Sequence, residues 1–331
     1  MDLTKKASVI IVTYNHSEYI ENCVKSVLSN NPLEIIVVDN GSTDGTLEIL
    51  ETMSEVRVVS GHGNVGYGAG NNIGVTVARG EYVVILNPDT LVEENWLEEL
   101  LKPLESHEKL VTTPKFLLFD GSKINGAGLI VHFTGLSFLR GLNADKDEFS
   151  KKEFVNGIAG ECFAMRRDDY LKLKFDENLL AYNEDGEFSW RLKVNDFRIL
   201  YVPESRFYHD YTLTVPPEKI YHLEKARYLI LRKYFSLKQI FIIIPSLIIA
   251  EILTWGYAIL KGSSGVKFKF RAFLDSLKNE VDPVECNIRN LLENLDFQIP
   301  DDQLTYSTLD KFIKRFANMV FLINYKLIVS R

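Results

Sequence analysis

The sequence is poor in cysteine and has fewer basic than acidic residues, and both features narrow the class of protein. Cysteine occurs only at Cys23, Cys162 and Cys286 in 331 residues. This spacing fits neither a disulfide framework nor a zinc cluster, so we expect a reducing, cytoplasmic compartment. The formal net charge of −7 argues against binding nucleic acid by phosphate neutralisation, so we expect no nucleic-acid partner.

We recognise neither a targeting signal nor an internal repeat in the amino-acid sequence. The apolar run Val9–Val12 after Lys5 and Lys6 is too short for a signal peptide. The composition, 46% hydrophobic and 25% charged, is that of a folded chain. The length of 331 residues suggests one main domain with an appendage.

Strand and helix patterns alternate through the first ninety residues. We expect strands at Ser8–Thr13, Ile35–Val38, Val56–Ser60 and Tyr82–Leu86, and helices at Ser17–Leu28, Asp44–Met53 (with Asp44 as N-cap) and Ala69–Ala78. This order predicts an α/β fold with a doubly wound, mostly parallel sheet built by right-handed crossovers.

Two of these apolar strands run into an acid. Asp39 ends the run Ile35–Asp39, and Asp89 follows Tyr82–Leu86 in the turn Asn87–Thr90. Ligands of open α/β sheets lie outside the carboxyl ends of the strands. Asp39 can there accept hydrogen bonds from a ribose or base, and Asp89 can bind Mg²⁺ or Mn²⁺. Both turns could instead be ordinary capped turns.

A glycine-rich segment raises the possibility of a dehydrogenase. Gly61–Gly66 matches the dinucleotide pattern G-x-G-x-x-G, but it follows the third strand rather than the first. The first turn, Thr13–His16, contains no glycine that would admit a pyrophosphate. We therefore interpret Gly61–Gly66 as a loop that opens the helix containing Asn71 and lines the pocket.

Five motifs in order resemble the family 2 glycosyltransferases of the GT-A fold, particularly the rhamnosyltransferase-like branch. The motifs are Ser8–Asn15, Val37–Thr46, Asn64–Gly66 with Asn71–Gly74, Leu86–Thr90, and Glu184-Asp185 with Arg191. The resemblance covers residues 7–210. It implies inverting transfer of a hexosyl or rhamnosyl unit from a nucleotide-diphosphate sugar to a hydroxyl of a glycan or lipid-linked acceptor. It also implies a GT-A catalytic domain at 1–215, with a nucleotide-sugar-binding half at 7–105 and an acceptor-binding half at 106–215.

The resemblance assigns roles to individual residues. Asp185 would be the general base, and Asp89 would ligate the divalent cation, with His209 as a second ligand. The nucleotide-sugar-binding set is Thr13, Tyr14, Asn15, Asp39, Gly66, Asn71, Asn87 and Asp89, and the acceptor and donor pocket set is Gly160, Glu161, Glu184, Trp190 and Arg191. Cys162 is expected to be a small core residue. Asn87 stands where the family often has a second acid, which weakens the expected binding of the cation.

The region 216–331 is expected to be helical and membrane-associated. Phe241–Leu260 is long enough to cross a bilayer, but it contains Pro245 and Glu251. It could be a transmembrane helix, a helix seated in one leaflet, or a soluble helix in an oligomer interface. Apolar residues recur at helical spacing near the C-terminus, at Phe312, Phe316, Met319, Val320 and Ile323. A peripheral or anchored position at the cytoplasmic face would give access to a lipid-linked acceptor.

Two other functions compete with glycosyl transfer. A nucleotidyltransferase would need a basic, glycine-rich loop after the first strand, and Thr13–Glu18 has no Lys or Arg. A non-catalytic glycan-binding relative would not need Asp39, Asp89 and Asp185 together.

Overall fold

The computed structural model describes residues 2–210, 216–301, 303 and 308–329. The chain forms two compact units, residues 1–129 with 139–212, and residues 130–138 with 213–331. The boundary predicted between residues 215 and 216 adjoins residues 211–215, which lie outside the described residues, so the predicted domain division stays a prediction.

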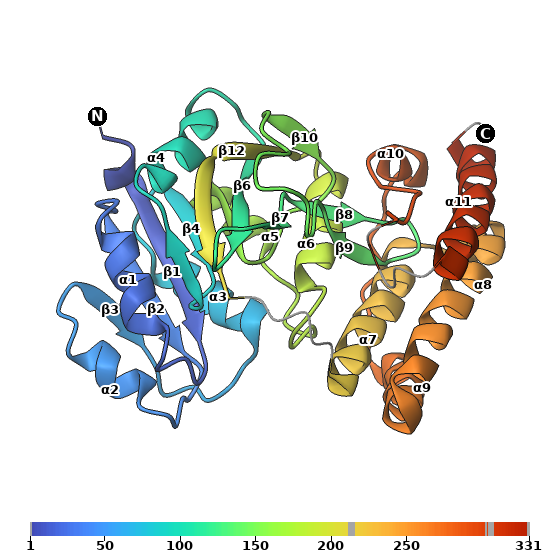
Figure 1. The fold of residues 1–331 in the computed structure, drawn as a ribbon, viewed down its shortest axis with the longest axis horizontal. Helices are drawn as coiled ribbons and strands as arrows, with labels where there is room; N and C mark the ends of the chain where they lie inside the picture. The colour runs from blue at the N-terminus through green and yellow to red at the C-terminus, as the bar shows by residue number, and fades with distance from the viewer. Residues whose placement is uncertain (1, 211–215, 302, 304–307, 330–331) are drawn as a thin grey trace. The chain divides into compact units, whose positions relative to one another are not determined.

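The first unit is built on a mixed, mostly parallel sheet (Figure 1). Its strands are β1 (Ala7–Thr13), β2 (Glu34–Asp39), β3 (Val56–Val59), β4 (Tyr82–Leu86), β5 (Thr90–Val92), β6 (Leu110–Leu118), β7 (Ile124–Gly126), β10 (Glu153–Val155), β11 (Cys162–Arg166) and β12 (Arg198–His209). The order is β10-β12-β6-β11-β4-β1-β2-β3, while β5 pairs with β12 and β7 with β6. A separate two-stranded sheet consists of β8 (Leu129–Val131) and β9 (Ser137–Leu139).

The first four strands are mutually parallel, which confirms the predicted fold class. β1 pairs in parallel with β2 and β4, and β2 pairs in parallel with β3. The sheet becomes mixed at β11, which runs antiparallel to both β4 and β6. β12 then returns parallel to β6.

Helices cover both faces of this sheet. They are α1 (Ile20–Leu28), α2 (Thr46–Glu51), α3 (Tyr67–Val77), α4 (Trp96–Leu101), α5 (Arg167–Leu173) and α6 (Glu184–Val194), with short 3₁₀ turns η1 (Thr4–Lys6) and η2 (Lys102–Glu105). Side chains alternate across β1, so that Val9 and Ile11 pack with α1 and α4, while Ile10 packs with α3, α5 and α6. Every strand residue of β1 is buried, as expected for a strand covered on both faces.

Two local features of the helices differ from the predictions or were not expected. Asp44 is not the N-cap of α2, because Gly45 (φ +94°) occupies that position and delays the helix to Thr46. Asp44 Oδ1 instead accepts a hydrogen bond from the backbone N–H of Thr46 (3.1 Å). α3 lies so close to the sheet that a Cβ at Gly74 would be 2.4 Å from Cγ2 of Ile10, and the absence of a side chain at Gly74 permits this approach.

The described residues of the second unit outside 130–138 are mostly helical, with non-helical segments at 279–287 and 294–301. Its helices are α7 (Pro217–Tyr234), α8 (Leu237–Leu260), α9 (Gly262–Lys278), α10 (Ile288–Glu293) and α11 (Thr308–Val329). α8 begins with a capping box, in which the side chains of Ser236 and Gln239 each accept from the other residue's backbone N–H. The helical C-terminal region predicted from the sequence is confirmed.

Candidate functional site

The parallel strands β1, β2 and β4 end at one edge of the sheet. β1 lies between the other two, with Thr13 in register with Asp39 and Ile11 in register with Leu86. The chain extends the sheet through β2 and β3 on one side of β1 and through β4 on the other. Such a reversal of strand order is where open α/β sheets bind ligands.

The turns that follow β1 and β2 are hydrogen-bonded to each other. The backbone N–H of Asn15 donates to Oγ of Ser42 (2.9 Å), and Oδ1 of Asn15 accepts from the backbone N–H of Thr43 (2.8 Å). Asn15 has a positive φ of 60°, a conformation that asparagine tolerates better than most residues. Thr13 is buried and Tyr14 is 44% exposed, so the phenol is free to meet a ligand.

Asp39 is buried at the end of β2 and organises the turn that follows it. Its carboxylate accepts hydrogen bonds from the backbone N–H groups of Gly41 (3.0 Å) and Ser42 (3.1 Å). These bonds fit the alternative of a capped turn, and they leave further acceptor capacity on the two carboxylate oxygens. The role of Asp39 toward a nucleoside stays a prediction.

Gly66 and Asn71 lie at the start of α3. Gly66 has φ +89°, and a Cβ there would be 2.5 Å from the carbonyl oxygen of Leu180, so the close approach requires glycine. The N–H of Tyr67 donates to the same Leu180 oxygen (3.1 Å). Asn71 is buried and donates to the carbonyl of Tyr67 (3.1 Å), while its own Oδ1 has no hydrogen-bond partner in the described part of the chain.

Asp89, in the turn that follows β4, faces His209, the last residue of β12. Oδ1 of Asp89 lies 3.4 Å from Nε2 of His209, and the backbone N–H of Asp210 donates to the carbonyl of Asp89 (3.1 Å). Burial alone would raise the pKa of Asp89, but the neighbouring His209 and His16 outweigh it, so the pKa lies below its ordinary value. The carboxylate is therefore ionised and available to a cation.

The surroundings of Asp89 and His209 fit a divalent cation. Nδ1 of His209 lies 2.8 Å from Oδ1 of Asn125, which can accept a hydrogen bond from it, and Nε2 of the same ring lies toward Asp89. Oδ1 of Asn87 and Oδ1 of Asp89 are buried and make no hydrogen bond within the described residues. Among residues 2–210, 216–301, 303 and 308–329, no group of three or more His, Cys, Asp and Glu could hold a metal. A bound cation would thus need ligands from the substrate as well.

Asp185 stands in the first turn of α6 and is held by two backbone donors. The N–H of Gly160 donates to Oδ2 (3.1 Å) and that of Gly186 to Oδ1 (2.7 Å). Burial, followed by the negative charge of Glu161, raises the pKa of Asp185 to about 6, although both backbone bonds oppose the rise. A carboxylate with such a pKa is mostly ionised at pH 7 and is a stronger base than an ordinary aspartate.

The loop before β11 connects Asp185 with the Asn87–Asp89 turn. The carbonyl of Glu161 accepts from the N–H of Asn87 (2.9 Å), and the carbonyl of Gly160 accepts from the hydroxyl of Tyr67 (2.6 Å). Oε2 of Glu161 is buried and has no hydrogen-bond partner among the residues described. One two-residue segment thus links the predicted base, the predicted cation ligand and the start of α3.

The other predicted pocket residues on α6 are Glu184, Trp190 and Arg191, and their role at the pocket stays a prediction. Glu184 and Trp190 are buried, Trp190 completely. Arg191 donates to both carboxylate oxygens of Glu187 (2.9 and 3.0 Å) and to the carbonyls of Leu173 and Lys174. Arg191 therefore ties α6 to the end of α5, and its role as a pocket residue stays a prediction. Cys162 is buried, as expected.

The structure adds three residues that sequence reasoning missed. The hydroxyl of Tyr67 donates a hydrogen bond to the carbonyl of Gly160, and Asn125 contacts the ring of His209. Asn40 connects the turn after β2 with the loop before α3 by donating to the carbonyl of Gly66 (3.1 Å). Asn40 and Tyr67 adjoin Asp39 and Gly66, so the motifs themselves could have found them. Asn125 has no such signal, because it lies on the short strand β7, 84 residues before His209.

This combination of a mixed, mostly parallel sheet and strand-end carboxylates is that of a glycosyltransferase with the GT-A fold. The chain belongs to glycosyl transferase family 2, whose family model matches residues 8–173. The sequence is similar to glycosyltransferase GlyG of Streptococcus pneumoniae, with 30% identity over 48% of this chain and 52% of GlyG. It is also similar to rhamnosyltransferase WbbL of Escherichia coli K12, with 24% identity over 61% of this chain and 82% of WbbL. The matches to GlyG and to an uncharacterized glycosyltransferase of Haemophilus influenzae span only 52% and 58% of those relatives.

Solved structures support the fold. TarS 1-349 of S. aureus in complex with UDP-GlcNAc matches 98% of this chain and 90% of its own, with a TM-score of 0.54 and 18% identity. GalNAc-T7 with UDP, GalNAc and Mn²⁺ matches 81% of this chain and 55% of its own, with a TM-score of 0.61 and 21% identity. At these identities the likeness establishes the fold alone.

Proposed function

We propose that this glycosyltransferase moves a hexosyl or rhamnosyl unit from a nucleotide-diphosphate sugar to a hydroxyl of a glycan or lipid-linked acceptor, with inversion. The observation that carries the proposal is the position of Asp185. Its carboxylate is anchored by Gly160, and the next residue, Glu161, is hydrogen-bonded to Asn87 in the turn that carries Asp89. The proposed base and the proposed cation-binding carboxylate are thereby connected through one short segment.

The donor would lie across the ends of β1, β2 and β4. The nucleoside would be bound by Thr13, Tyr14, Asn15 and Asp39. The wall of the donor-binding pocket would be lined by Gly66 and Asn71. Oδ1 of Asn71 and Oε2 of Glu161 are buried acceptors, and both could accept hydrogen bonds from hydroxyl groups of the sugar or ribose. Because two structural relatives were solved with UDP or a UDP-sugar, uridine-diphosphate sugars are the first donors to test.

Asp89 and His209 would hold Mg²⁺ or Mn²⁺, together with oxygens of the diphosphate. The cation supplies positive charge at the diphosphate as the glycosidic bond breaks. Asn87 contributes a neutral amide oxygen instead of a second carboxylate, so the chain itself offers one acid ligand at this turn. We propose that cation binding therefore depends strongly on bound diphosphate.

Asp185 would take the proton from the acceptor hydroxyl. The acceptor oxygen forms its bond to the anomeric carbon as the bond from that carbon to the diphosphate oxygen breaks. The electron pair of the broken bond leaves with the diphosphate, and the proton stays on Asp185. A single displacement from the face opposite the leaving group inverts the anomeric centre.

We propose a cytoplasmic location and the division into a catalytic domain at 1–215 and a helical region at 216–331. Cys23, Cys162 and Cys286 are all free thiols, which supports a reducing compartment.

The proposal is tested with a panel of nucleotide sugars, each with Mg²⁺ or Mn²⁺, in thermal unfolding and in release of nucleoside diphosphate. The true donor should raise the midpoint of unfolding and release nucleoside diphosphate in a cation-dependent way. Release of pyrophosphate from a nucleoside triphosphate and a sugar phosphate would instead show a nucleotidyltransferase. Binding of glycan without turnover of any donor would show a non-catalytic relative.

A further inference from the structure

Large apolar side chains of α8 are exposed in one row. Phe241, Ile248, Ile252 and Ile259 are 72%, 53%, 60% and 63% exposed. Their spacings of 7, 4 and 7 residues place all four on one side of an α-helix. α8 is the described helix that is long and apolar enough to cross a membrane, yet only 22% of its most apolar window is buried.

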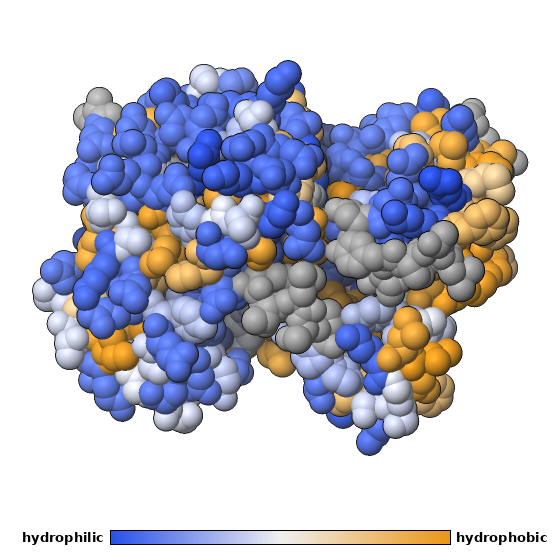
Figure 2. Space-filling view, in the orientation of Figure 1, coloured by the Kyte–Doolittle hydropathy of each residue, from blue (hydrophilic) through white to orange (hydrophobic). Residues whose placement is uncertain are grey.

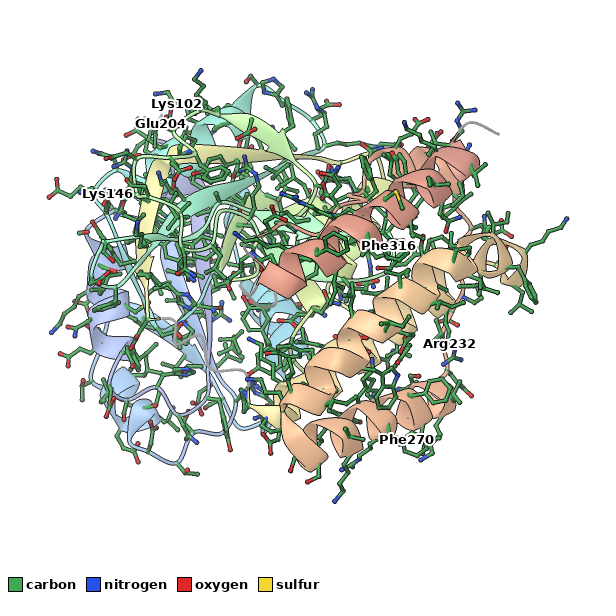
Figure 3. The ribbon with its side chains drawn as sticks, turned by 45° about the vertical axis from the view of Figure 1, so that its right-hand side comes forward. Lys102, Lys146, Glu204, Arg232, Phe270 and Phe316 are labelled. Carbon is green, nitrogen blue, oxygen red and sulfur yellow. The ribbon has the colours of Figure 1, made fainter. Side chains whose placement is uncertain are left out.

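Two of the helices that pack against α8 carry similar rows. On α9 the exposed apolar residues are Val266, Phe270, Phe273, Leu274 and Leu277, and on α11 they are Phe312, Ile313, Phe316, Met319, Ile323 and Leu327. We call the rows on α8, α9 and α11 together the apolar surface. Figure 2 shows apolar residues gathered over α8 and α11 at the right-hand edge and over α9 below, and Figure 3 labels Phe270 and Phe316.

Exposed cations flank two of these rows. Lys267, Arg271 and Lys278 each follow an apolar residue of the α9 row, and Lys311, Arg315 and Lys326 each precede one on α11. At spacings of 4, 7 and 11 residues, each set of three lies along one side of its helix. An amphipathic helix with a basic margin is typical of segments that lie in the plane of an anionic membrane surface.

The two units differ in net charge, and the unit that carries the flanking cations is the positive one. Residues 130–138 and 213–331 contain seventeen Lys and Arg against twelve Asp and Glu, a net charge of +5, whereas the rest of the chain has a net charge of −12. The positive charge is therefore concentrated in the unit that exposes the apolar surface. This segregation favours a negatively charged partner for that unit.

The buried face of α8 is incompatible with a helix that crosses the bilayer alone. Glu251 of α8 forms ion pairs with Arg227 of α7 and with Lys269 of α9 (3.3 Å to Lys269). Ser246 donates a hydrogen bond to Asn324 of α11 (2.7 Å), whose amide in turn donates to the carbonyl of Ile242 near Pro245 (2.8 Å). These polar contacts bind α8 to helices rich in charged residues, which could not enter the hydrocarbon with it.

We propose that the apolar surface binds in the plane of an anionic lipid bilayer, with its apolar side chains at the acyl boundary and the flanking cations on lipid phosphates. This interaction does not depend on the proposed glycosyl transfer. It would hold the protein at the membrane without a transmembrane segment.

The experiment is flotation of the full chain with vesicles, either of phosphatidylcholine or of an equal mixture of phosphatidylcholine and phosphatidylglycerol. The wild type should float with the mixed vesicles, less with the neutral ones, and less again as salt is raised. The double variant Phe270→Asp/Phe316→Asp should bind at least about tenfold more weakly. The matched control Leu33→Asp/Phe119→Asp removes apolar residues that are 41% and 46% exposed in the first unit, and it should bind as the wild type does.

Charge reversal separates the electrostatic contribution. Lys267→Glu/Lys311→Glu should weaken binding to mixed vesicles about tenfold, while Lys25→Glu/Lys102→Glu in the first unit should leave it unchanged. Thermal unfolding of each variant shows whether it is folded. Alkaline carbonate should release the bound wild type.

Three results would overturn the proposal. The first is failure of the folded wild type to float with mixed vesicles. The second is retention after the carbonate wash, which would show a spanning helix. The third is a stable oligomer of the wild type that Phe270→Asp/Phe316→Asp dissociates without any vesicle binding, which would show that a second copy covers the surface.

Discussion

The backbone of Gly160 contacts the side chain of Asp185. The N–H of Gly160 donates to Oδ2 of Asp185 (3.1 Å), and a Cβ at residue 160 would lie 3.1 Å from Cβ of Asp185. A side chain at residue 160 would therefore have to displace the carboxylate of Asp185 by a few tenths of an ångström. Because Glu161 follows directly, the same loop determines both the orientation and the electrostatic environment of Asp185.

Glu161→Gln should shift the acidic limb of the pH profile toward lower pH. The charge of Glu161 contributes to the raised pKa of Asp185, about 6, so removing it favours ionised Asp185 at lower pH. In the wild type, kcat/KM should fall as pH drops through about 6, because the base becomes protonated. The measurement is kcat/KM against pH, with Glu204→Gln at the surface (labelled in Figure 3) as a control that should keep the wild-type midpoint. An unmoved limb in Glu161→Gln would show that Asp185 does not set it.

Asp89→Ala should reduce cation-dependent binding of nucleoside diphosphate by at least about tenfold, because it removes the ionised ligand that faces His209. Binding without a cation should change little. Isothermal titration calorimetry with and without Mn²⁺ measures both, and Asp120→Asn in an exposed turn is the control. Equal cation-dependent affinity in Asp89→Ala and wild type would contradict the proposed cation site.

Gly66→Ala should destabilise the protein more than Gly61→Ala does. Both glycines have φ +89°, but a Cβ at Gly66 would lie 2.5 Å from the carbonyl oxygen of Leu180, whereas nothing lies within 4 Å at Gly61. The substitutions share the strain of a positive φ, and the steric conflict at Gly66 should cost about 1–3 kcal/mol more. Urea unfolding of both variants measures the difference. Equal losses of unfolding free energy would contradict the close approach of α3 to Leu180.

The change that Asp185→Asn makes in the free energy of unfolding should be more favourable at pH 7 than at pH 4 by about 1–3 kcal/mol, because the backbone hydrogen bond lost with one carboxylate oxygen is lost at both pH values. The pKa of Asp185 is raised above its unfolded value, so the native state holds the proton more tightly. The cost of ionising Asp185 is absent below pH 4, grows up to about pH 6 and is fully present above it. Urea unfolding of the variant and the wild type at pH 4 and pH 7 measures this difference. An equal effect of the substitution at the two pH values would contradict the raised pKa of Asp185.

The sequence predicts the parallel half of the sheet because its signals are local. β1 to β4 are short apolar runs between turn residues, and Asp39 and Asp89 stand at strand ends for the same reason. β11 has no such signal for its place: its antiparallel insertion between β4 and β6 depends on pairings such as Phe163 with Ile85, which are distant in sequence. Segment 130–138 likewise belongs with the helical unit through contacts such as that of His132 with Asp296.

The site likewise contains residues that the sequence can predict and contacts that it cannot. Residues within motifs are predictable, but the bond between Asn125 and His209 depends on the tertiary fold. The sequence also could not show that Glu251, a costly charge in the apolar run, is paired with Arg227 and Lys269.

The most direct test of the proposed mechanism is turnover by Asp185→Asn compared with binding of the donor. The variant keeps the shape of the side chain but cannot accept the proton, so kcat should fall about 10²–10⁴-fold while the donor still raises the midpoint of thermal unfolding. Asp168→Asn, an exposed acid on α5, is the matched control and should turn over as the wild type does. Undiminished kcat in a folded, donor-binding Asp185→Asn would contradict the account.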